Sequence, residues 1–326
     1  MLFYDSVKKE LAQLEAEMEK IVPKEPQEVY NMIMPYIKRG GKRIRPVLTF
    51  LCCKAVGGEV KETIKAAAII ELFHNFTLIH DDIEDSSEMR RGVPTLHRQY
   101  GIPVALNSGD ALYTIIWRAI ASLETEKERK LPKLYAESFR RVVEGQGIEL
   151  NWHGKNIFNI SEKDYVAMIK GKTAALTGLS CELGAYLGGA SMEQATALRE
   201  FGEALGISFQ IKDDILNVTG TFEKYKKEIG GDITEGKRTL MVVHALKNAS
   251  QQEQEYLKKT LISKTNKKSD IEKVISIFES TDAIEYAAEK SREFKDEALK
   301  SLKSLKDSNE KNLLLELMKY VLEREE

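Results

Sequence analysis

The distribution of proline is the feature that most constrains the fold of this 326-residue chain. All seven prolines lie at or before Pro132, and residues 133–326 contain none. Proline interrupts an α-helix because it has no backbone N–H to donate and because its ring clashes with the preceding turn. Long helices can therefore run through the second part of the chain without a break.

Apolar residues recur at helical spacing near both ends of the sequence, at Val7, Leu11, Leu14, Met18 and Ile21 and again at Leu314, Leu317 and Val321. No segment shows the alternating pattern, bounded by hairpin turns, that indicates a β-strand. The linkers are short, and none is of low complexity. The sequence predicts an all-α helical bundle in a single domain over residues 1–326.

The overall composition, with 31% charged and 42% hydrophobic residues, is that of an ordinary globular protein. The formal net charge of -2 gives no reason to expect a nucleic acid or an anionic membrane as a partner. Three cysteines without metal or redox spacing favour a reducing cytoplasm. The N-terminus lacks the apolar core of a signal peptide, and no stretch predicts stable membrane insertion.

An acidic motif follows an apolar helical stretch and contains four carboxylates, at Asp81, Asp82, Glu84 and Asp85. On a helix with about 3.6 residues per turn, Asp81 and Asp85 lie on one face, one turn apart. Such carboxylates repel one another unless a cation lies between them, and Mg²⁺ commonly binds one or two carboxylates together with phosphate oxygens. Arg90 and Arg91 could bind such a phosphate. A solvated acidic helix end is the alternative interpretation.

A second acidic motif argues against that alternative. Asp213 and Asp214 are again adjacent, and Asn217 adds an oxygen ligand one turn later. Cations follow this motif too, at Lys224, Lys226, Lys227 and Lys237. Two paired-aspartate motifs far apart in the sequence, each followed by cations, predict that two helices bring the clusters together around a metal and a phosphate.

Three further segments are weak signals when each is taken alone. The segment Gly40–Arg45 combines two glycines with Lys42 and Arg45, which suits an anion but also suits a basic turn. His74 precedes Asp81 by about two turns on nearly the same helical face. Lys172 and Thr173 lack the glycine-framed spacing of a P-loop, so solvated lysine is the simpler interpretation there.

Taken together and in this order, these motifs resemble the trans-isoprenyl diphosphate synthases, also called polyprenyl synthetases. The resemblance covers residues 40–239 and adds the pattern Gly-x-Asp-x-x-Glu-Gly-Lys, which ends at Lys237. It implies an all-helical fold around a deep central cavity, usually in a homodimer. The implied activity is condensation of isopentenyl diphosphate with an allylic diphosphate such as dimethylallyl, geranyl or farnesyl diphosphate.

The same resemblance implies a role for each site residue. Three Mg²⁺ ions would be held by Asp81, Asp82, Asp85, Asp213, Asp214 and Asn217. The allylic diphosphate would be bound by Arg90, Lys172, Lys227 and Lys237, and isopentenyl diphosphate by Lys42, Arg45, His74 and Arg91. Lys172, Thr173 and Gln210 would act in catalysis, the last two by stabilising the allylic cation. The chain departs from the usual pattern at Asn217 and Glu149, where many members have Asp.

Side-chain bulk before the first acidic motif sets product length in the family. Phe76 lies five residues before Asp81, as in archaeal-type geranylgeranyl diphosphate synthases, and position 77 holds threonine rather than a second aromatic residue. Ideal helix geometry nevertheless turns Phe76 about 140° away from Asp81 and leaves Thr77 almost beneath it. Phe73 is therefore the other candidate for the floor of the chain-length pocket, and both phenylalanines could also be ordinary core residues.

Competing functions remain open at this point. A farnesyl or longer-chain synthase would share all of these motifs. A terpene cyclase would not need a second diphosphate site at Lys42, Arg45 and His74. A non-catalytic partner subunit of a heteromeric synthase would usually lack part of the aspartate or arginine set, and a plain helical scaffold would need none of it.

Overall fold

The computed structural model describes residues 1–123, 128–220 and 230–322. The regular secondary structure of these residues is helical apart from one hairpin of two short strands. The prediction of an all-α fold is therefore confirmed. None of the helices in the described ranges combines the length and apolarity needed to cross a membrane.

The chain divides into two compact units. The first unit comprises residues 1–136, 179–199 and 304–314, and the second comprises residues 137–178, 200–303 and 315–326. Five elements contribute residues to both units: α9 (Leu131–Gly154), α11 (Ala175–Leu187), α12 (Met192–Thr219), η4 (Leu302–Ser304) and α19 (Asn309–Leu322). The assignment of residues 1–326 to a single domain stays a prediction.

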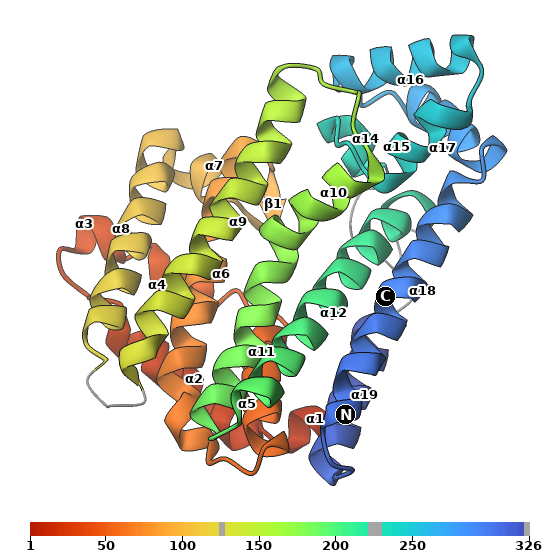
Figure 1. Ribbon diagram of the computed structural model, residues 1–326. Helices are drawn as coiled ribbons and strands as arrows, with labels where there is room; N and C mark the ends of the chain where they lie inside the picture. Colours follow the sequence, from red (N-terminus) through yellow and green to blue (C-terminus); the bar gives the residue numbers. More distant parts are fainter. Residues whose placement is uncertain (124–127, 221–229, 323–326) are drawn as a thin grey trace. The chain divides into compact units, whose positions relative to one another are not determined.

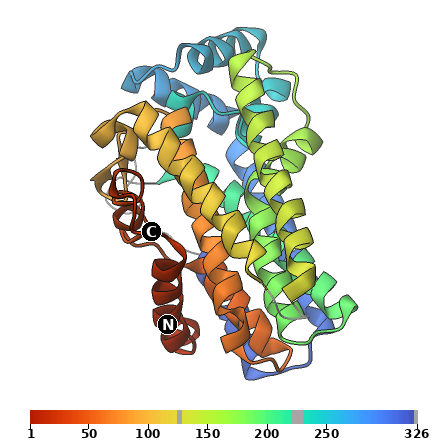
Figure 2. The same cartoon turned by 90° about the vertical axis from the view of Figure 1, so that its left-hand side faces the viewer.

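The remaining elements of the first unit are α1 (Leu2–Asp5), α2 (Lys8–Ile21), α3 (Gln27–Tyr30), α4 (Ile33–Ile37), α5 (Ile44–Ala55), η1 (Val60–Thr63), α6 (Ile64–Glu84), β1 (Met89–Arg90), β2 (Val93–Pro94), α7 (Leu96–Tyr100), α8 (Ile102–Ala121) and η2 (Glu128–Lys130). Helix α6 contains neither proline nor glycine. It packs against α2, α5 and α8, and Figure 2 shows α6 and α8 running alongside each other. Most residues in the first half of α6 are buried, and α6 is therefore the central helix of this unit.

The remaining elements of the second unit are α10 (Glu162–Ile169), η3 (Lys170–Ala174), α14 (Gly231–Glu235), α15 (Leu240–Asn248), α16 (Gln251–Ser263), α17 (Lys268–Ser280) and α18 (Ala283–Ser301). Helix α15 packs against α10, α16, α17 and α18, and the four helices α15–α18 follow one another along the teal-to-blue part of the ribbon in Figure 1. Apolar side chains such as Ile211, Leu240 and Phe278 form the core of this unit. Element η3 is a π-helical turn between α10 and α11.

Candidate active site

The first acidic motif occupies the last turn of α6. The C-terminal end of a helix carries partial negative charge, so carboxylates are least favourable there, and the last turn of α6 contains no basic residue. Asp81 and Asp85 are partly exposed, whereas Asp82 is buried, with 1% of its surface accessible. The helix end therefore presents concentrated negative charge that a cation would stabilise.

Both oxygens of the buried Asp82 carboxylate are engaged. Tyr36 of α4 donates its hydroxyl hydrogen to Oδ2 at 2.9 Å, and Arg90 donates Nε–H to Oδ1 at 2.7 Å. Burial, followed by the charge of Asp82, raises the pKa of Tyr36 and keeps its hydroxyl protonated. Asp82 is thus held by one neutral and one charged donor.

A two-residue hairpin turn presents the arginine pair. Strands β1 and β2 are antiparallel, with Arg90 opposite Val93, so Arg91 and Gly92 form the turn. Both have positive φ, 55° and 75°, as a type I′ turn requires. Glycine adopts this conformation readily, whereas a non-glycine residue there is uncommon and is often found at functional sites.

The guanidinium of Arg91 lies over the glycine-rich loop that precedes α5. A Cβ at Gly41 would come within 2.8 Å of Arg91 Nη2, so a side chain there would push the guanidinium away, and the φ of 144° at this position also favours glycine. In the same loop Arg43 is structural, because it pairs with Glu15 at 2.8 Å and with the buried Glu71 at 2.6 Å. The neighbouring Arg45 Nε is buried without a hydrogen-bond partner.

His74 of α6 belongs to the same basic group. Burial lowers its pKa well below the usual value, and the charges of Arg45, Arg91, Arg90 and Arg43 lower it further. The imidazole is therefore neutral among four arginines, whose buried counter-charges are Glu71 and Asp82. An excess of fixed positive charge with an unsatisfied buried donor suits an anion with several oxygens, such as a diphosphate. Lys42, on the same loop, is exposed.

The residues expected to set product length form an aromatic group between α6 and α8. Phe73 and Phe76 both contact Tyr113 of α8, with ring centroids 6.4 and 5.0 Å apart, and contact each other at 5.4 Å. Phe73 is fully buried, whereas Phe76 is partly exposed. Thr77 donates its hydroxyl hydrogen to the His74 carbonyl at 2.8 Å. The two phenylalanines are thus members of one group rather than alternatives on different faces.

The second acidic motif, in the second unit, repeats the arrangement of the first. Asp213 of α12 is partly exposed, and Asp214 is buried. Tyr165 of α10 donates its hydroxyl hydrogen to Asp214 Oδ2 at 2.7 Å, and Gln210 Nε2 donates to Oδ1 at 2.9 Å. Burial raises the pKa of Asp214 to about 8, and the charges of Asp232 and Asp213 add to this effect.

Asn217, one turn after Asp213, has a structural contact of its own. Its Oδ1 accepts the backbone N–H of Asp232 at 3.0 Å, and its backbone carbonyl accepts the N–H of Gly230 at 2.8 Å. These bonds tie α12 to the start of α14, the segment that carries Asp232. Lys237, which follows α14, pairs with Asp232 at 3.0 Å.

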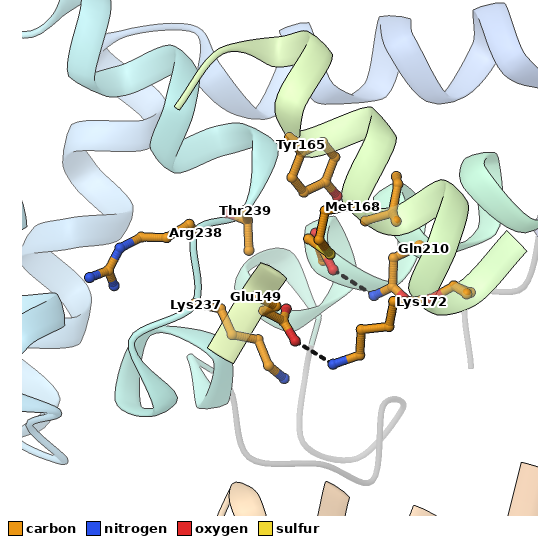
Figure 3. A pocket seen from close by; sticks show the side chains of 11 residues that line it. Glu149, Tyr165, Met168, Lys172, Gln210, Lys237, Arg238 and Thr239 are labelled. Atoms are coloured by element: carbon orange, nitrogen blue, oxygen red, sulfur yellow. Dashed lines mark hydrogen bonds and ion pairs between the residues drawn. The ribbon is translucent and has the colours of Figure 1, made fainter. Parts of the chain in front are cut away.

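A small pocket of about 40 Å³ lies beside this motif. Its walls are formed by Glu149, Tyr165, Met168, Ile169, Lys172, Thr173, Gln210, Asp214, Lys237, Arg238 and Thr239. Figure 3 shows Glu149 between the ammonium groups of Lys237 and Lys172, and it forms an ion pair with Lys172. Although burial opposes ionisation of Glu149, the two lysines hold its pKa below the usual value. Thr173 donates to Gln210 Oε1 at 2.9 Å, which links the threonine to Asp214 through the glutamine.

A glycine contact fixes Lys172 and Thr173 in place. Both residues lie in the π-helical turn η3, a rare geometry that often occurs at functional sites. A side chain at Gly145 of α9 would lie 2.2 Å from the backbone nitrogen of Lys172, and one at Gly171 would lie 2.8 Å from the Arg141 carbonyl. The backbones of α9 and η3 can therefore touch only because both positions are glycine.

The donor sets in both units fit Mg²⁺. Among the residues that the structure describes, no three Asp, Glu, His or Cys side chains converge as a ready-made metal cage. Mg²⁺ does not require such a cage, because it usually takes one or two carboxylates and completes its shell with water and substrate phosphate oxygens. The partly exposed Asp81, Asp85 and Asp213 are hard oxygen donors with neighbouring negative charge that a dication would offset.

Sequence reasoning named most of these charged residues but missed several that position them. Tyr36 and Tyr165 carried no signal, since tyrosine at helical spacing is indistinguishable from core. Glu71 carried no signal either, whereas Asp232 gave a weak one through its place in the motif that ends at Lys237. Lys227, expected at the allylic diphosphate, lies outside the described residues.

Comparison with known proteins identifies the family. Residues 26–278 match the model of the family described as polyprenyl synthetase. The chain therefore belongs to the polyprenyl synthetase family.

Individual relatives match over nearly the whole length. A protein named geranylgeranyl pyrophosphate synthase from Geoglobus acetivorans is 37% identical over 310 residues, which cover 94% of each chain. A short chain isoprenyl diphosphate synthase from Methanothermobacter thermautotrophicus is 38% identical over 89% of this chain and 88% of its own. The crystal structure of geranylgeranyl pyrophosphate synthetase from Pyrococcus horikoshii superposes with a TM-score of 0.92, at 32% identity, over 99% of this chain and 98% of that one.

Proposed function

We propose that the chain is a trans-prenyltransferase that condenses isopentenyl diphosphate with an allylic diphosphate and forms geranylgeranyl diphosphate. The observation that carries this proposal is the presence of two kinds of anion site: a basic group around Arg45, His74 and Arg91, and a lysine-lined pocket beside Asp214. Two diphosphate substrates need two such sites. The names of the relatives from Geoglobus and Pyrococcus support the product.

The basic group of the first unit is proposed to bind isopentenyl diphosphate. Arg45 and Arg91 supply permanent charge, and the neutral His74 supplies a directional hydrogen bond. Lys42 is proposed to close this site from the exposed end of the loop. Crowding of cations favours the anionic substrate, because its diphosphate relieves the repulsion between the arginines.

The acidic motifs, with Lys172, Lys237 and Arg90, are proposed to bind the diphosphate of the allylic substrate. Asp81, Asp82, Asp85, Asp213, Asp214 and Asn217 are the candidate holders of Mg²⁺, and three ions per site is the number that the family resemblance implies. Mg²⁺ would neutralise the charge that develops on the leaving diphosphate. Lys172 and Lys237 line the pocket beside Asp214 and are proposed to contribute fixed positive charge to the binding of this diphosphate.

The reaction follows from these charges. Cleavage of the allylic carbon–oxygen bond releases diphosphate and leaves an allylic cation, which the oxygens of Thr173 and Gln210 are proposed to stabilise. The double bond of isopentenyl diphosphate attacks this cation and forms the new carbon–carbon bond. The positive charge now lies on the isopentenyl unit. A proton leaves the carbon next to this charged carbon, the released diphosphate accepts it, and the new alkene forms.

Product analysis tests the proposal. Purified protein is incubated with Mg²⁺, labelled isopentenyl diphosphate and dimethylallyl, geranyl or farnesyl diphosphate in turn, and the dephosphorylated products are sized. We expect geranylgeraniol from each primer and no product from Asp213→Ala, a variant whose partly exposed side chain can be removed without emptying the core.

The other outcomes discriminate between the alternatives. Farnesol or longer alcohols would keep the prenyltransferase activity and refute the product. Absence of any product from the folded wild-type protein would refute the enzyme and favour a non-catalytic partner subunit. Full activity of Asp213→Ala would refute the proposed metal ligands.

A further inference from the structure

We propose that Tyr36 and Tyr165 are positioning residues that orient the two paired-aspartate motifs for binding Mg²⁺ and diphosphate. This inference rests on the proposed function, because it assigns a task to residues that would act on the same ligands. Neither tyrosine belongs to a charged motif, and each reaches its aspartate from a different helix, α4 to α6 in the first unit and α10 to α12 in the second.

The two motifs share one local design. In each pair the second aspartate, Asp82 or Asp214, is buried, and the first, Asp81 or Asp213, remains partly exposed. In each pair one oxygen of the buried carboxylate accepts a tyrosine hydroxyl, at 2.9 Å for Tyr36 and at 2.7 Å for Tyr165. The other oxygen also accepts a hydrogen bond. In Asp82 the donor is Arg90, later in the sequence, and in Asp214 it is Gln210, one helical turn earlier.

Fixing the second aspartate also fixes the first. Neighbouring residues on a helix differ by about 100° in direction, so a helix rotation that moved Asp82 would move Asp81 by the same angle. A buried carboxylate held by two hydrogen bonds therefore fixes the direction in which the exposed aspartate leaves the helix. The tyrosine lies on a different helix from the aspartate pair, so its hydrogen bond sets the orientation of the pair relative to a neighbouring helix. A residue on the same helix as the pair would rotate with it and could not do this.

A tyrosine hydroxyl suits this task because it carries no charge. A buried carboxylate without a donor is costly, but a charged donor offsets part of the negative charge that attracts a dication, as Arg90 does at Asp82. Tyrosine satisfies the oxygen and leaves the charge of the pair in place. In the second unit both donors to Asp214, Tyr165 and Gln210, are neutral, so neither of them offsets the negative charge of the pair when a dication binds.

The chain offers a matched control. Tyr135 is also fully buried, and its hydroxyl donates to the backbone carbonyl of Ala66 at 3.1 Å rather than to an aspartate. The variants Tyr36→Phe, Tyr165→Phe and Tyr135→Phe each remove one hydroxyl from a buried ring. A purely structural role predicts similar behaviour for all three.

The experiment measures binding of inorganic diphosphate to the full chain in excess Mg²⁺ by calorimetry, well below the melting temperature of each variant. We expect Tyr36→Phe and Tyr165→Phe to bind about tenfold more weakly than wild type, the effect of one hydrogen bond to a charged group. Tyr135→Phe is expected to bind within about twofold of wild type. In turnover assays, Tyr165→Phe should need more Mg²⁺ for half-maximal rate, with an unchanged KM for isopentenyl diphosphate, and higher Mg²⁺ should restore its rate.

Each possible result bears on the positioning role of the tyrosines, on the proposed function or on both. If all three variants bind Mg²⁺ and diphosphate equally well, the positioning role is overturned, whatever the wild type catalyses. If wild type binds diphosphate but forms no prenyl product, the proposed function fails and the binding comparison still decides the role of the tyrosines. If wild type does not bind diphosphate in Mg²⁺, both are refuted. If Tyr36→Phe fails to fold, the comparison of Tyr165→Phe with Tyr135→Phe tests the positioning role alone.

Discussion

Phe73 and Phe76 differ in burial although both contact the ring of Tyr113. Phe73 is fully enclosed by the first unit, whereas Phe76 is partly exposed and also contacts His80, at 4.7 Å between ring centroids. A partly exposed aromatic side chain is the one that a growing hydrocarbon chain could meet, and a fully enclosed one supports it from behind. The contacts thus favour Phe76 as the floor with Phe73 and Tyr113 as its support.

Truncation of these rings should separate product length from stability. We expect Phe76→Ser to lengthen the products by one or more isoprene units, because the floor is removed. Phe73→Ser should cost about 3–5 kcal/mol of the free energy of unfolding, the usual cost of emptying a buried phenylalanine site. Sizing of the dephosphorylated products, together with urea unfolding of each variant, checks both expectations.

Tyr113→Phe is the control for this series, because it keeps the ring and its contacts with both phenylalanines. Its products should match those of wild type. Longer products from Phe73→Ser with unchanged products from Phe76→Ser would show that the floor lies at Phe73.

At the residue scale, the sequence indicated the charged residues of the candidate site but not the tyrosines that hydrogen-bond to them. Asp81 and Asp213 could be selected because paired carboxylates are improbable in a core, whereas Arg45 and Lys172 were selected through the family resemblance. Tyr36 and Tyr165 could not, since an aromatic residue at helical spacing is ordinary core, and only the three-dimensional contact reveals its hydroxyl bond to an aspartate.

At the scale of elements, the hairpin β1–β2 escaped prediction because each strand is only two residues long. A strand this short contains no alternation of polar and apolar residues to detect. Gly92 does indicate a turn, but a single glycine does not predict paired strands on either side of it. The hairpin matters because it directs Arg90 to Asp82 and Arg91 to the loop of Gly41.

The π-helical turn η3 was equally unpredictable, because its sequence continues the helical pattern of α10 and α11. Its position depends on the contact with Gly145. A methyl group at Gly145 would overlap the backbone of Lys172, which cannot move aside as a flexible side chain could. The element that carries Lys172 and Thr173 would therefore have to shift.

We expect Gly145→Ala to lower kcat by roughly 100-fold, since displacement of catalytic groups by about 1 Å has effects of this size. Gly147→Ala, on the same helix, is the matched control, because a Cβ at Gly147 has no heavy atom within 4 Å. Alanine there should leave kcat unchanged and slightly stabilise the exposed helix. Steady-state kinetics of both variants test this, and a fully active Gly145→Ala would refute the importance of the contact.

At the scale of the whole molecule, the absence of proline after Pro132 correctly indicated long helices, among them α12 and α18. The all-α class follows from local pattern, which one sequence contains. The division into two compact units does not, because α9, α11, α12 and α19 contribute to both without any change in composition at the boundary.

Each unit contains one acidic motif and its neighbouring cations. We propose that a diphosphate is neutralised by the two motifs together rather than by either one alone. Mg²⁺ without an anion leaves the arginines and lysines repelling one another, and diphosphate without Mg²⁺ is repelled by the aspartates. We expect thermal unfolding to respond weakly to either ligand alone and to shift upward by several degrees with both. At a hundredfold excess over Kd, binding adds about 2.7 kcal/mol to stability.

Scanning fluorimetry with Mg²⁺, inorganic diphosphate or both tests this synergy. Asp81→Ala and Asp213→Ala should each abolish the joint shift, because each removes a partly exposed carboxylate from a different unit. Asp296→Ala on α18 removes an exposed carboxylate outside both motifs and should keep it. A joint shift that persists in Asp213→Ala but not in Asp81→Ala would mean that the first motif alone holds the metal, and the second would then serve the pocket of Lys172 and Lys237 without binding Mg²⁺.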